Sequence, residues 1–244
     1  MNSKLAKRIL KKVESDYNVI AKEWNEKRPF LILGKERVRQ YVKNHQKILD
    51  AGCGNAVLYD VLADRSIDYV GLDVSAKLLK IAQKRIKNLK KTGRVKFIKG
   101  DVTKLPFKEK SFDVVFALAV LHHIPSSELR QKAVKEIWRV LRPGGRVIIT
   151  VWNMASDYAE EKFQVSEQLK NPPVGWDRGD VSIPWKATPG KKIQRYIHFF
   201  LKKELVTLFK NNGFKNIKCS YDKDGCFVKS PKDGAGLFLT AIKK

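Results

Sequence analysis

Hydrophobic positions follow two alternating patterns over residues 46–152 of this 244-residue chain. Short apolar runs, such as residues 112–117, predict buried strands. Between these runs lie segments whose apolar residues recur three and four positions apart, which is typical of helices with one buried side. Strands that alternate with helices in this way predict an α/β fold, doubly wound around a mostly parallel sheet.

A glycine-containing turn follows the first predicted strand, in the sequence Leu-Asp-Ala-Gly-Cys-Gly-Asn-Ala at residues 49–56. Gly52 and Gly54 allow a sharp turn and the close approach of a ligand that a Cβ atom would exclude. The next strand ends at Asp73, about twenty residues after Asp50, where a carboxylate can bind a ribose hydroxyl. The turn lacks the third glycine of a dinucleotide site and begins with an acid, which suits a cationic nucleoside without phosphates. The pattern therefore predicts S-adenosylmethionine as the cofactor.

Later landmarks extend this site. A third predicted strand ends at Asp101 and a fourth at Ala117, and a helix that stops at Pro143-Gly144-Gly145 leads into a fifth strand. We expect Asp101, Val102 and Ala117 to contribute to the cofactor site, since ligands bind beyond the carboxyl ends of such strands. In combination, residues 45–152 resemble the class I S-adenosylmethionine-dependent methyltransferases. That resemblance implies a Rossmann-like, seven-stranded sheet with an antiparallel edge strand.

We interpret the chain as one domain with four parts. Residues 1–45 are expected to form helices that cover part of the substrate, and residues 46–152 the cofactor-binding core. Residues 153–200 contain many Pro and Gly residues and few periodic stretches, so they predict a long irregular loop that serves as a lid. Residues 201–244 predict a helix that stops at Gly213 and a final pair of strands.

Composition narrows the class of protein. No apolar run approaches the ~18 residues that span a bilayer, so no membrane segment is expected. The basic start of the chain could be a transit peptide, but its apolar spacing predicts a helix of the fold. The cysteines at positions 53, 219 and 226 have neither metal-ligand spacing nor an even number, so we expect no metal site and a reducing, cytoplasmic location.

The formal net charge of +25 is large for this length. Such a charge indicates a polyanionic partner, because contacts with phosphates release counterions and strengthen binding. Residues 76–100 contain many lysines and arginines and no acidic residue, and much of this segment predicts the solvent side of a helix. A general lysine bias of the source proteome is the alternative, so the charge alone leaves both readings open.

A more specific resemblance covers essentially the whole chain. It rests on Tyr17-Asn18-x-Ile20-Ala21 with Arg28, His122-His123, Trp152, Asp180-Val-x-x-Pro184-Trp185, and Arg195-Tyr196-x-His198 followed by Glu204-Leu205. These blocks resemble the tRNA wobble-uridine carboxymethyl methyltransferases, which esterify 5-carboxymethyluridine at tRNA position 34. The resemblance implies a tRNA anticodon stem-loop as the partner. The histidine pair is shared with many small-molecule methyltransferases, whereas the blocks at 180–185 and 195–198 lie in the variable insert and are more specific.

The reaction that this resemblance implies requires modest chemistry. The nucleophile is a carboxylate with a pKa near ~4, so it is already ionised and needs no strong base. Positioning and desolvation should supply most of the catalysis. We expect Arg28 and Arg195 to orient the carboxylate or nearby phosphates, and His122 or His198 to donate a hydrogen bond. The expected substrate-binding residues, with aromatic rings on which an extruded base can stack, are Tyr17, Trp152, Asp180, Trp185 and Tyr196.

Structural roles compete with several of these assignments. Tyr17 and Trp24 have the spacing of residues in the core of a helix, and His123 is expected to be a structural hydrogen-bond partner. The alternative for Asp180 is a purely structural role in fixing the lid, and that for Arg28 is a solvated side chain. Two other functions also remain: a small-molecule O- or C-methyltransferase that acts on a quinone precursor or a small acid, and a non-catalytic tRNA-binding relative. The intact acids and glycines of the cofactor site argue against the second.

Two departures from the family pattern carry expectations of their own. Ala56 replaces a third small-loop glycine, and we expect it to keep a negative φ. Members of the family often need a small zinc-binding adaptor that covers the edge of the sheet. Here the expected edge strand has basic residues at alternate positions, Arg94 and Lys96, which discourage pairing. We therefore expect this chain to be soluble and active alone, with the adaptor as the alternative.

Overall fold

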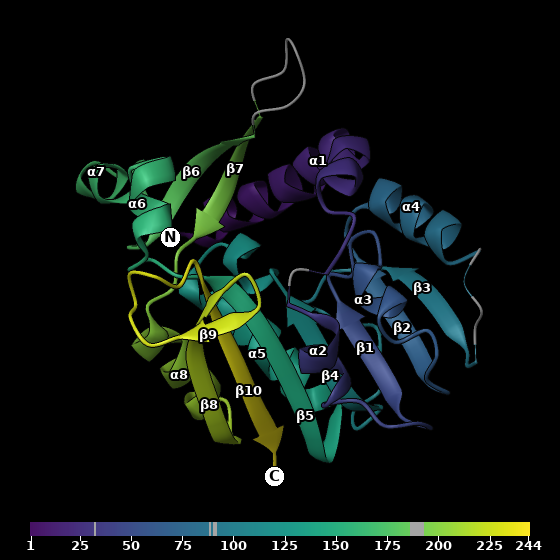
Figure 1. The fold of residues 1–244 in the computed structure, drawn as a ribbon. Helices are drawn as coiled ribbons and strands as arrows, with labels where there is room; N and C mark the ends of the chain where they lie inside the picture. The colour runs from purple at the N-terminus through teal and green to yellow at the C-terminus, as the bar shows by residue number, and fades with distance from the viewer. Residues whose placement is uncertain (32, 88, 90–91, 186–192) are drawn as a thin grey trace.

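An eight-stranded sheet runs through the centre of the computed structural model, which describes residues 1–31, 33–87, 89, 92–185 and 193–244 (Figure 1). Lys90 and Lys91 of the basic segment, and the Pro189-Gly190 part of the expected lid, lie outside the described residues. The strands, in spatial order, are β3 (Val95–Lys99), β2 (Asp68–Asp73), β1 (Lys47–Ala51), β4 (Phe112–Leu118), β5 (Leu141–Trp152), β10 (Gly236–Lys243), β8 (Phe214–Lys223) and β9 (Cys226–Val228).

Strands β1 to β5 are parallel to one another, as the alternation of strands and helices predicts. β10 pairs antiparallel with both β5 and β8, and the edge strand β9 pairs antiparallel with β8, so the expected antiparallel edge is present; the described part has one strand more than expected. The doubly wound, mostly parallel fold is confirmed, and β3 forms one edge of the sheet.

Side chains that alternate along each strand divide the core into two layers. Leu49 and Val115 pack on one face with α5 (Ser127–Val140) and α8 (Lys202–Asn211). Ile48 and Val114 pack on the other face. That second face is covered by α2 (Lys35–Arg39), α3 (Val57–Asp60) and α4 (Ala76–Lys87). Both faces of the parallel strands are therefore buried, which is why their sequences are continuously apolar.

Helix α1 (Ser3–Lys27) is a single helix that lies across the carboxyl ends of the strands beside α4 (Figure 1). The Asn2 side chain accepts a hydrogen bond from the Leu5 backbone and so caps its first turn. Its buried side packs with Leu78 of α4 and with Trp185. The second N-terminal helix, α2, is short and spans only residues 35–39.

The insert at residues 153–200 is not the irregular loop that its Pro and Gly residues predict. It contains α6 (Asp157–Phe163), α7 (Val165–Lys170) and an antiparallel pair, β6 (Asp180–Trp185) and β7 (Ile193–His198). These elements bury a small apolar core of their own, in which Val181, Ile183 and Ile197 are fully buried. Each element has only six or seven residues, which is too short to display a clear period in the sequence.

Candidate active site

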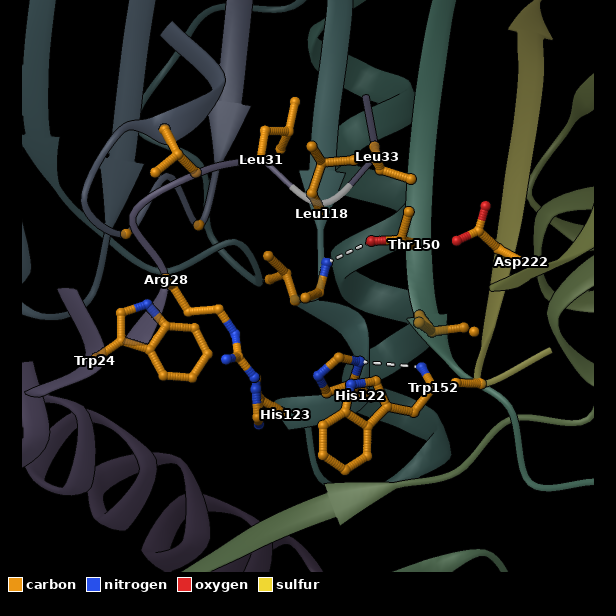
Figure 2. A pocket seen from close by; sticks show the side chains of 18 of the residues that line it. Trp24, Arg28, Leu31, Leu33, Leu118, His122, His123, Thr150, Trp152 and Asp222 are labelled. Atoms are coloured by element: carbon orange, nitrogen blue, oxygen red, sulfur yellow. Dashed lines mark hydrogen bonds between the residues drawn. The ribbon is translucent and has the colours of Figure 1, made fainter. Parts of the chain in front are cut away.

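A cavity of about 880 Å³ opens beyond the carboxyl ends of β1, β2, β4 and β5 (Figure 2). Leu31, Leu33 and Leu118 line it at one end of the view, and Trp152 with the 3₁₀ helix η1 (Leu121–His123) at the other. Helix α1 and strand β7 cover it from above. Parallel strands place their carboxyl ends on the same edge, so residues far apart in the sequence meet here.

The glycine turn forms the floor of one end of the cavity. Gly52 has a φ of +86° and Gly54 of +54°, in the left-handed region that favours glycine. A Cβ atom at Gly52 would lie 2.3 Å from Val120 Cγ2, so glycine is required there for space as well as for conformation. At Gly54 a Cβ atom would make only an ordinary contact of 3.8 Å with Trp24 Nε1, so there the positive φ is what favours glycine.

Two buried carboxylates flank this turn. Asp50 is 2% exposed and accepts a hydrogen bond of 2.5 Å from the Tyr69 hydroxyl. Burial raises the pKa of the Asp50 carboxyl to about 7, and the charge of Asp73 adds to this effect. Asp73 accepts hydrogen bonds from the backbone N–H groups of Gly54 and Ser75, and burial raises its pKa as well. A pair of desolvated acids in one cavity stabilises a cationic ligand, which fits the sulfonium and ammonium groups of S-adenosylmethionine.

Ala56 corrects one expectation. Its φ is +61°, not negative, and the residue is fully buried where the turn enters α3. Its N–H donates to the Cys53 carbonyl at 2.8 Å, which closes the turn. The turn thus imposes a left-handed residue at this position, at a cost of roughly 1 kcal/mol for a side chain that has a Cβ atom.

The strand ends extend the cofactor end of the cavity, with two shifts from the expected residues. Val102 lines the cavity, whereas Asp101 does not, because its carboxylate accepts the Thr103 backbone N–H at 2.8 Å. Ala117 is fully buried inside the sheet, and its successors Leu118 and Ala119 line the cavity instead. The assignments of Asp101 and Ala117 are therefore revised.

Tyr17 and His123 connect α1 to the lid. The His123 Nδ1 atom lies 3.3 Å from the Tyr196 carbonyl oxygen, which can only accept, so this nitrogen carries the proton. Nε2 then accepts from the Tyr17 hydroxyl at 2.7 Å. Burial, with the nearby Arg195 charge, lowers the pKa of His123 to about 3, so the ring is neutral. Both side chains also line the cavity, and they do so from a fixed hydrogen-bonded arrangement.

His122 and Trp152 lie side by side on the cavity wall, with ring centroids 5.6 Å apart (Figure 2). The His122 Nδ1 atom accepts from the Trp152 backbone N–H at 3.4 Å. Burial lowers the pKa of His122 well below its usual value, and the positive groups around it act in the same direction. A neutral ring whose Nδ1 accepts must carry its proton on Nε2, where it can donate a hydrogen bond.

Arg195 lines the cavity from strand β7 and is only 6% exposed. Its guanidinium carbon lies 4.8 Å from the centroid of Trp185 and 5.9 Å from that of Trp152. Its Nε atom has no hydrogen-bond partner in the part of the chain that the structure describes, and no described acid forms an ion pair with it. Burial of a cation without a carboxylate partner costs desolvation free energy, so an anion that binds beside it is stabilised.

Arg28 lines the cavity at the end of α1, where its guanidinium carbon lies 5.4 Å from the Trp24 centroid (Figure 2). The Asn55 side chain donates to the Arg28 backbone carbonyl and to Asn25, at 3.0 Å each. The glycine turn therefore holds the end of α1, and with it the Arg28 side chain, at the mouth of the cavity.

Four of the expected site residues lie behind the cavity wall. Asp180 is fully buried, and its carboxylate accepts from Tyr196 at 2.6 Å and lies 2.7 Å from His198 Nδ1. The other ring nitrogen of His198 lies 2.8 Å from Glu204, so neither nitrogen faces the cavity. Trp185 donates to Glu23 of α1 and packs behind Arg195. We revise Asp180, Trp185, Tyr196 and His198 from substrate contacts to supports of the lid.

Sequence reasoning missed the C-terminal side of the cavity. Residues of the β8 end and of the loop before β10 line it, among them Asp222, Lys223, Lys232 and Asp233. α6 contributes Asp157, Tyr158, Glu161 and Lys162. The sequence could have indicated the residues near β8 and β10. A strand antiparallel to β5 begins at the carboxyl end of β5, so the loop that precedes β10 borders the site.

Comparisons with known proteins agree with this geometry. The profile of the methyltransferase domain family matches residues 49–149. A protein of Encephalitozoon cuniculi (strain GB-M1), whose name describes it as a methyltransferase, is 30% identical over 188 residues, 77% of this chain and 79% of that protein. A demethylmenaquinone methyltransferase of Lactiplantibacillus plantarum is 26% identical over 230 residues, 87% of this chain and 92% of that protein.

Some of the similar proteins are named as tRNA methyltransferases. A tRNA (carboxymethyluridine(34)-5-O)-methyltransferase of Arabidopsis thaliana is 37% identical over 105 residues, 43% of this chain. This chain matches about a quarter of that protein, 24% of its length.

Solved structures share the fold at lower identity. A SAM-dependent methyltransferase from Methanosarcina mazei has a TM-score of 0.69 at 23% identity, over 84% of this chain and 96% of that chain. A methyltransferase in complex with the Trm112 methyltransferase activator of Haloferax volcanii has a TM-score of 0.65 at 17% identity, over 94% of this chain and 96% of that chain.

The raised pKa of Asp50 predicts how cofactor binding depends on pH. A cationic ligand favours the ionised carboxyl, so affinity should be full above the pKa of about 7 and should fall as Asp50 gains its proton at lower pH. We expect the Kd for S-adenosylmethionine to be about tenfold higher at pH 6 than at pH 8, by titration calorimetry.

Two variants test whether Asp50 causes this pH dependence of cofactor binding. The Asp50→Asn variant should have the same Kd for S-adenosylmethionine at pH 6 and at pH 8. Tyr69→Phe removes the hydrogen bond that lowers the Asp50 pKa, so the midpoint should move to higher pH. A wild-type Kd that does not change over this range contradicts the prediction.

Proposed function

This chain belongs to the family of S-adenosylmethionine-dependent methyltransferases, and on that premise we propose that it methylates the carboxylate of 5-carboxymethyluridine at tRNA wobble position 34. The product is a methyl ester, and the reaction is expected in the cytoplasm. The cofactor supplies an electrophilic methyl group on a sulfonium. The Asp50 and Asp73 carboxylates and the Gly52 to Gly54 turn are the groups that hold it.

The observation that supports an anionic acceptor most strongly is the state of Arg195. Its guanidinium is buried, lines the cavity and has no carboxylate partner among the described residues. A substrate carboxylate at this position would offset the cost of burying the cation. The same contact would orient the oxygen nucleophile toward the cofactor end of the cavity.

Neutral and aromatic groups beside Arg195 suit the rest of a modified uridine. Trp152, which stacks on Phe163, lines the cavity with a ring on which an extruded base can also stack, and Tyr17 lines the cavity from α1. His122 carries its proton on Nε2 and can donate to a uracil carbonyl. Because both histidines are neutral, Arg195 and Arg28 are the cations that this part of the wall offers to the acceptor carboxylate.

The proposed step needs no general base. The acceptor carboxylate is ionised near neutral pH, and its oxygen forms the new O–CH₃ bond as the S–CH₃ bond breaks. The electron pair of the broken bond stays on sulfur, so no proton is transferred. The protein's part is to exclude water with α1 and the lid and to hold the carboxylate in line, with few donors so that its nucleophilicity is kept.

A small-molecule methyltransferase is the second candidate. The similarity to the demethylmenaquinone methyltransferase extends over 92% of that protein, whereas that to the tRNA enzyme covers 24% of its length. Leu31, Leu33 and Phe30 also give one part of the rim an apolar lining. The buried Arg195, which has no carboxylate ion pair among the described residues, favours an anionic acceptor over a neutral quinone ring.

Nucleoside analysis decides between these candidates. The purified chain is incubated with labelled S-adenosylmethionine and tRNA that carries 5-carboxymethyluridine, and the digested nucleosides are separated by mass spectrometry. We expect label in the methyl ester of the wobble nucleoside and none in tRNA that lacks the carboxymethyl group. Label in demethylmenaquinone and none in RNA would instead establish the second candidate.

Replacement of Arg195 tests the role of the unpaired cation. Arg195→Ala should lower kcat/KM on a modified anticodon stem-loop by about a hundredfold, because the carboxylate loses a desolvated ionic hydrogen bond. The Kd for S-adenosylmethionine should change little. Arg178→Ala is the matched control, since Arg178 is an exposed arginine of the same insert that does not line the cavity. Full activity of Arg195→Ala would remove Arg195 from the mechanism.

The need for an adaptor is a separate prediction. Lys96 and Lys99 are exposed on edge strand β3, where lysines discourage pairing with another strand. We therefore expect the chain to elute as a soluble monomer in gel filtration and to be active alone. Co-expression with a zinc-binding activator of the Trm112 type should change kcat by less than about twofold. A chain that aggregates until it is co-expressed with such a partner contradicts this expectation.

A further inference from the structure

A stripe of four lysines runs along the solvent side of α4. Lys77, Lys80, Lys84 and Lys87 are three or four residues apart, so they share one face of the helix over roughly 15 Å. All four are exposed, α4 contains no acidic residue, and none of the four forms an ion pair with a described residue. This lysine stripe is the structural counterpart of the acid-free segment in the sequence.

The lysine stripe lies beside the cavity. Leu78, on the buried side of α4, is one of the residues that line the cavity. The Asn18 side chain of α1 accepts a hydrogen bond from the Lys77 backbone, so the start of α4 is fixed against the helix that covers the site (Figure 1). The first residue of the stripe, Lys77, therefore lies next to the helix that covers the site.

The opposite side of the mouth has mixed charge. Asp157 and Glu161 of α6, with Asp224 and Asp233 of the C-terminal connections, line the cavity there. Three lysines, Lys162, Lys223 and Lys232, lie among these acids, so this side attracts no polyanion as strongly as the acid-free α4 does. The α4 side of the mouth is therefore the more positive of the two.

We propose that the lysine stripe of α4 is the docking surface for the phosphate backbone of the RNA. The inference rests on the proposed function, because it takes RNA as the substrate. Lysines suit this role as point charges that contact phosphates without reading the sequence. An anionic membrane is the weaker occupant, because the apolar sides of α1 and α4 are buried in the fold and cannot insert into lipid.

A charge-matched pair of variants tests the docking surface. The triple variant Lys80→Gln, Lys84→Gln, Lys87→Gln removes three charges from the stripe. The control Lys203→Gln, Lys210→Gln, Lys215→Gln removes three exposed lysines from α8 and β8, which lie at the other end of the sheet from α4. Glutamine keeps helix propensity and avoids new repulsion. None of these six residues lines the cavity.

Binding of a fluorescein-labelled anticodon stem-loop is measured by anisotropy over a series of salt concentrations. The stripe variant should bind about tenfold more weakly at low salt, with a log–log salt slope reduced by about 2 for three lost contacts. KM for the modified stem-loop should rise similarly, while kcat and the Kd for S-adenosylmethionine stay near wild type. The control should bind RNA within about twofold of wild type.

Each outcome separates this inference from the proposed function. Equal losses in the two triple variants would overturn the docking surface, even if methyl ester is formed. If the stripe variant lost binding to phosphatidylserine vesicles and kept its binding to RNA, the stripe would be a membrane-binding surface, and the RNA-docking proposal would be overturned. A stripe-dependent affinity for RNA without any methyl transfer to 5-carboxymethyluridine would support the surface and reject only the proposed acceptor.

Discussion

The burial of two acids around one glycine turn is the constraint on which the site depends. Asp50 and Asp73 end up together because β1 and β2 are parallel and in register, with Asp50 opposite Gly71. Neither acid has an ion-pair partner among the described residues, and burial raises the pKa of both. Because both pKa values are raised in the folded protein, ionisation of the pair lowers the free energy of unfolding near neutral pH. A bound cation offsets this loss. The strain at the turn has the same explanation, since the backbone bends to leave room for the ligand.

On the other side of the cavity the buried charge is positive, and the lid positions it. Arg195 sits on β7 with its guanidinium toward the cavity, and the next residues on that strand are tied down behind it. Asp180 is the centre of this support: it is fully buried and within hydrogen-bonding distance of Tyr196 and His198, and Arg130 of α5 lies 3.9 Å away. The network fastens the lid to the domain, so the position of one cation is determined by several residues that never reach the cavity.

The sequence predicts the cofactor end of the site better than its cover. Glycines at a strand end and an acid at the next one follow from the parallel sheet, so Gly52, Gly54 and Asp73 could be placed without coordinates. The conformation of Ala56 could not, because it is imposed by the turn into α3 rather than preferred by alanine. The lid was misjudged because its elements are too short to show a period. Once β7 is known to be a strand, the alternation of side chains separates Arg195 from Tyr196 and His198.

This division between the two ends of the cavity has a physical origin. The cofactor end is built on the central strands of one sheet, whose burial on both faces leaves a continuous apolar signal. The cover is assembled from α1, η1 and the lid, which meet only through tertiary contacts such as the one from Tyr17 to His123. Its chemistry depends on which side chains remain without partners after these contacts form. A buried guanidinium without a carboxylate ion pair among the described residues is visible only in the folded chain, and this feature, more than any motif, supports the proposal of an anionic acceptor.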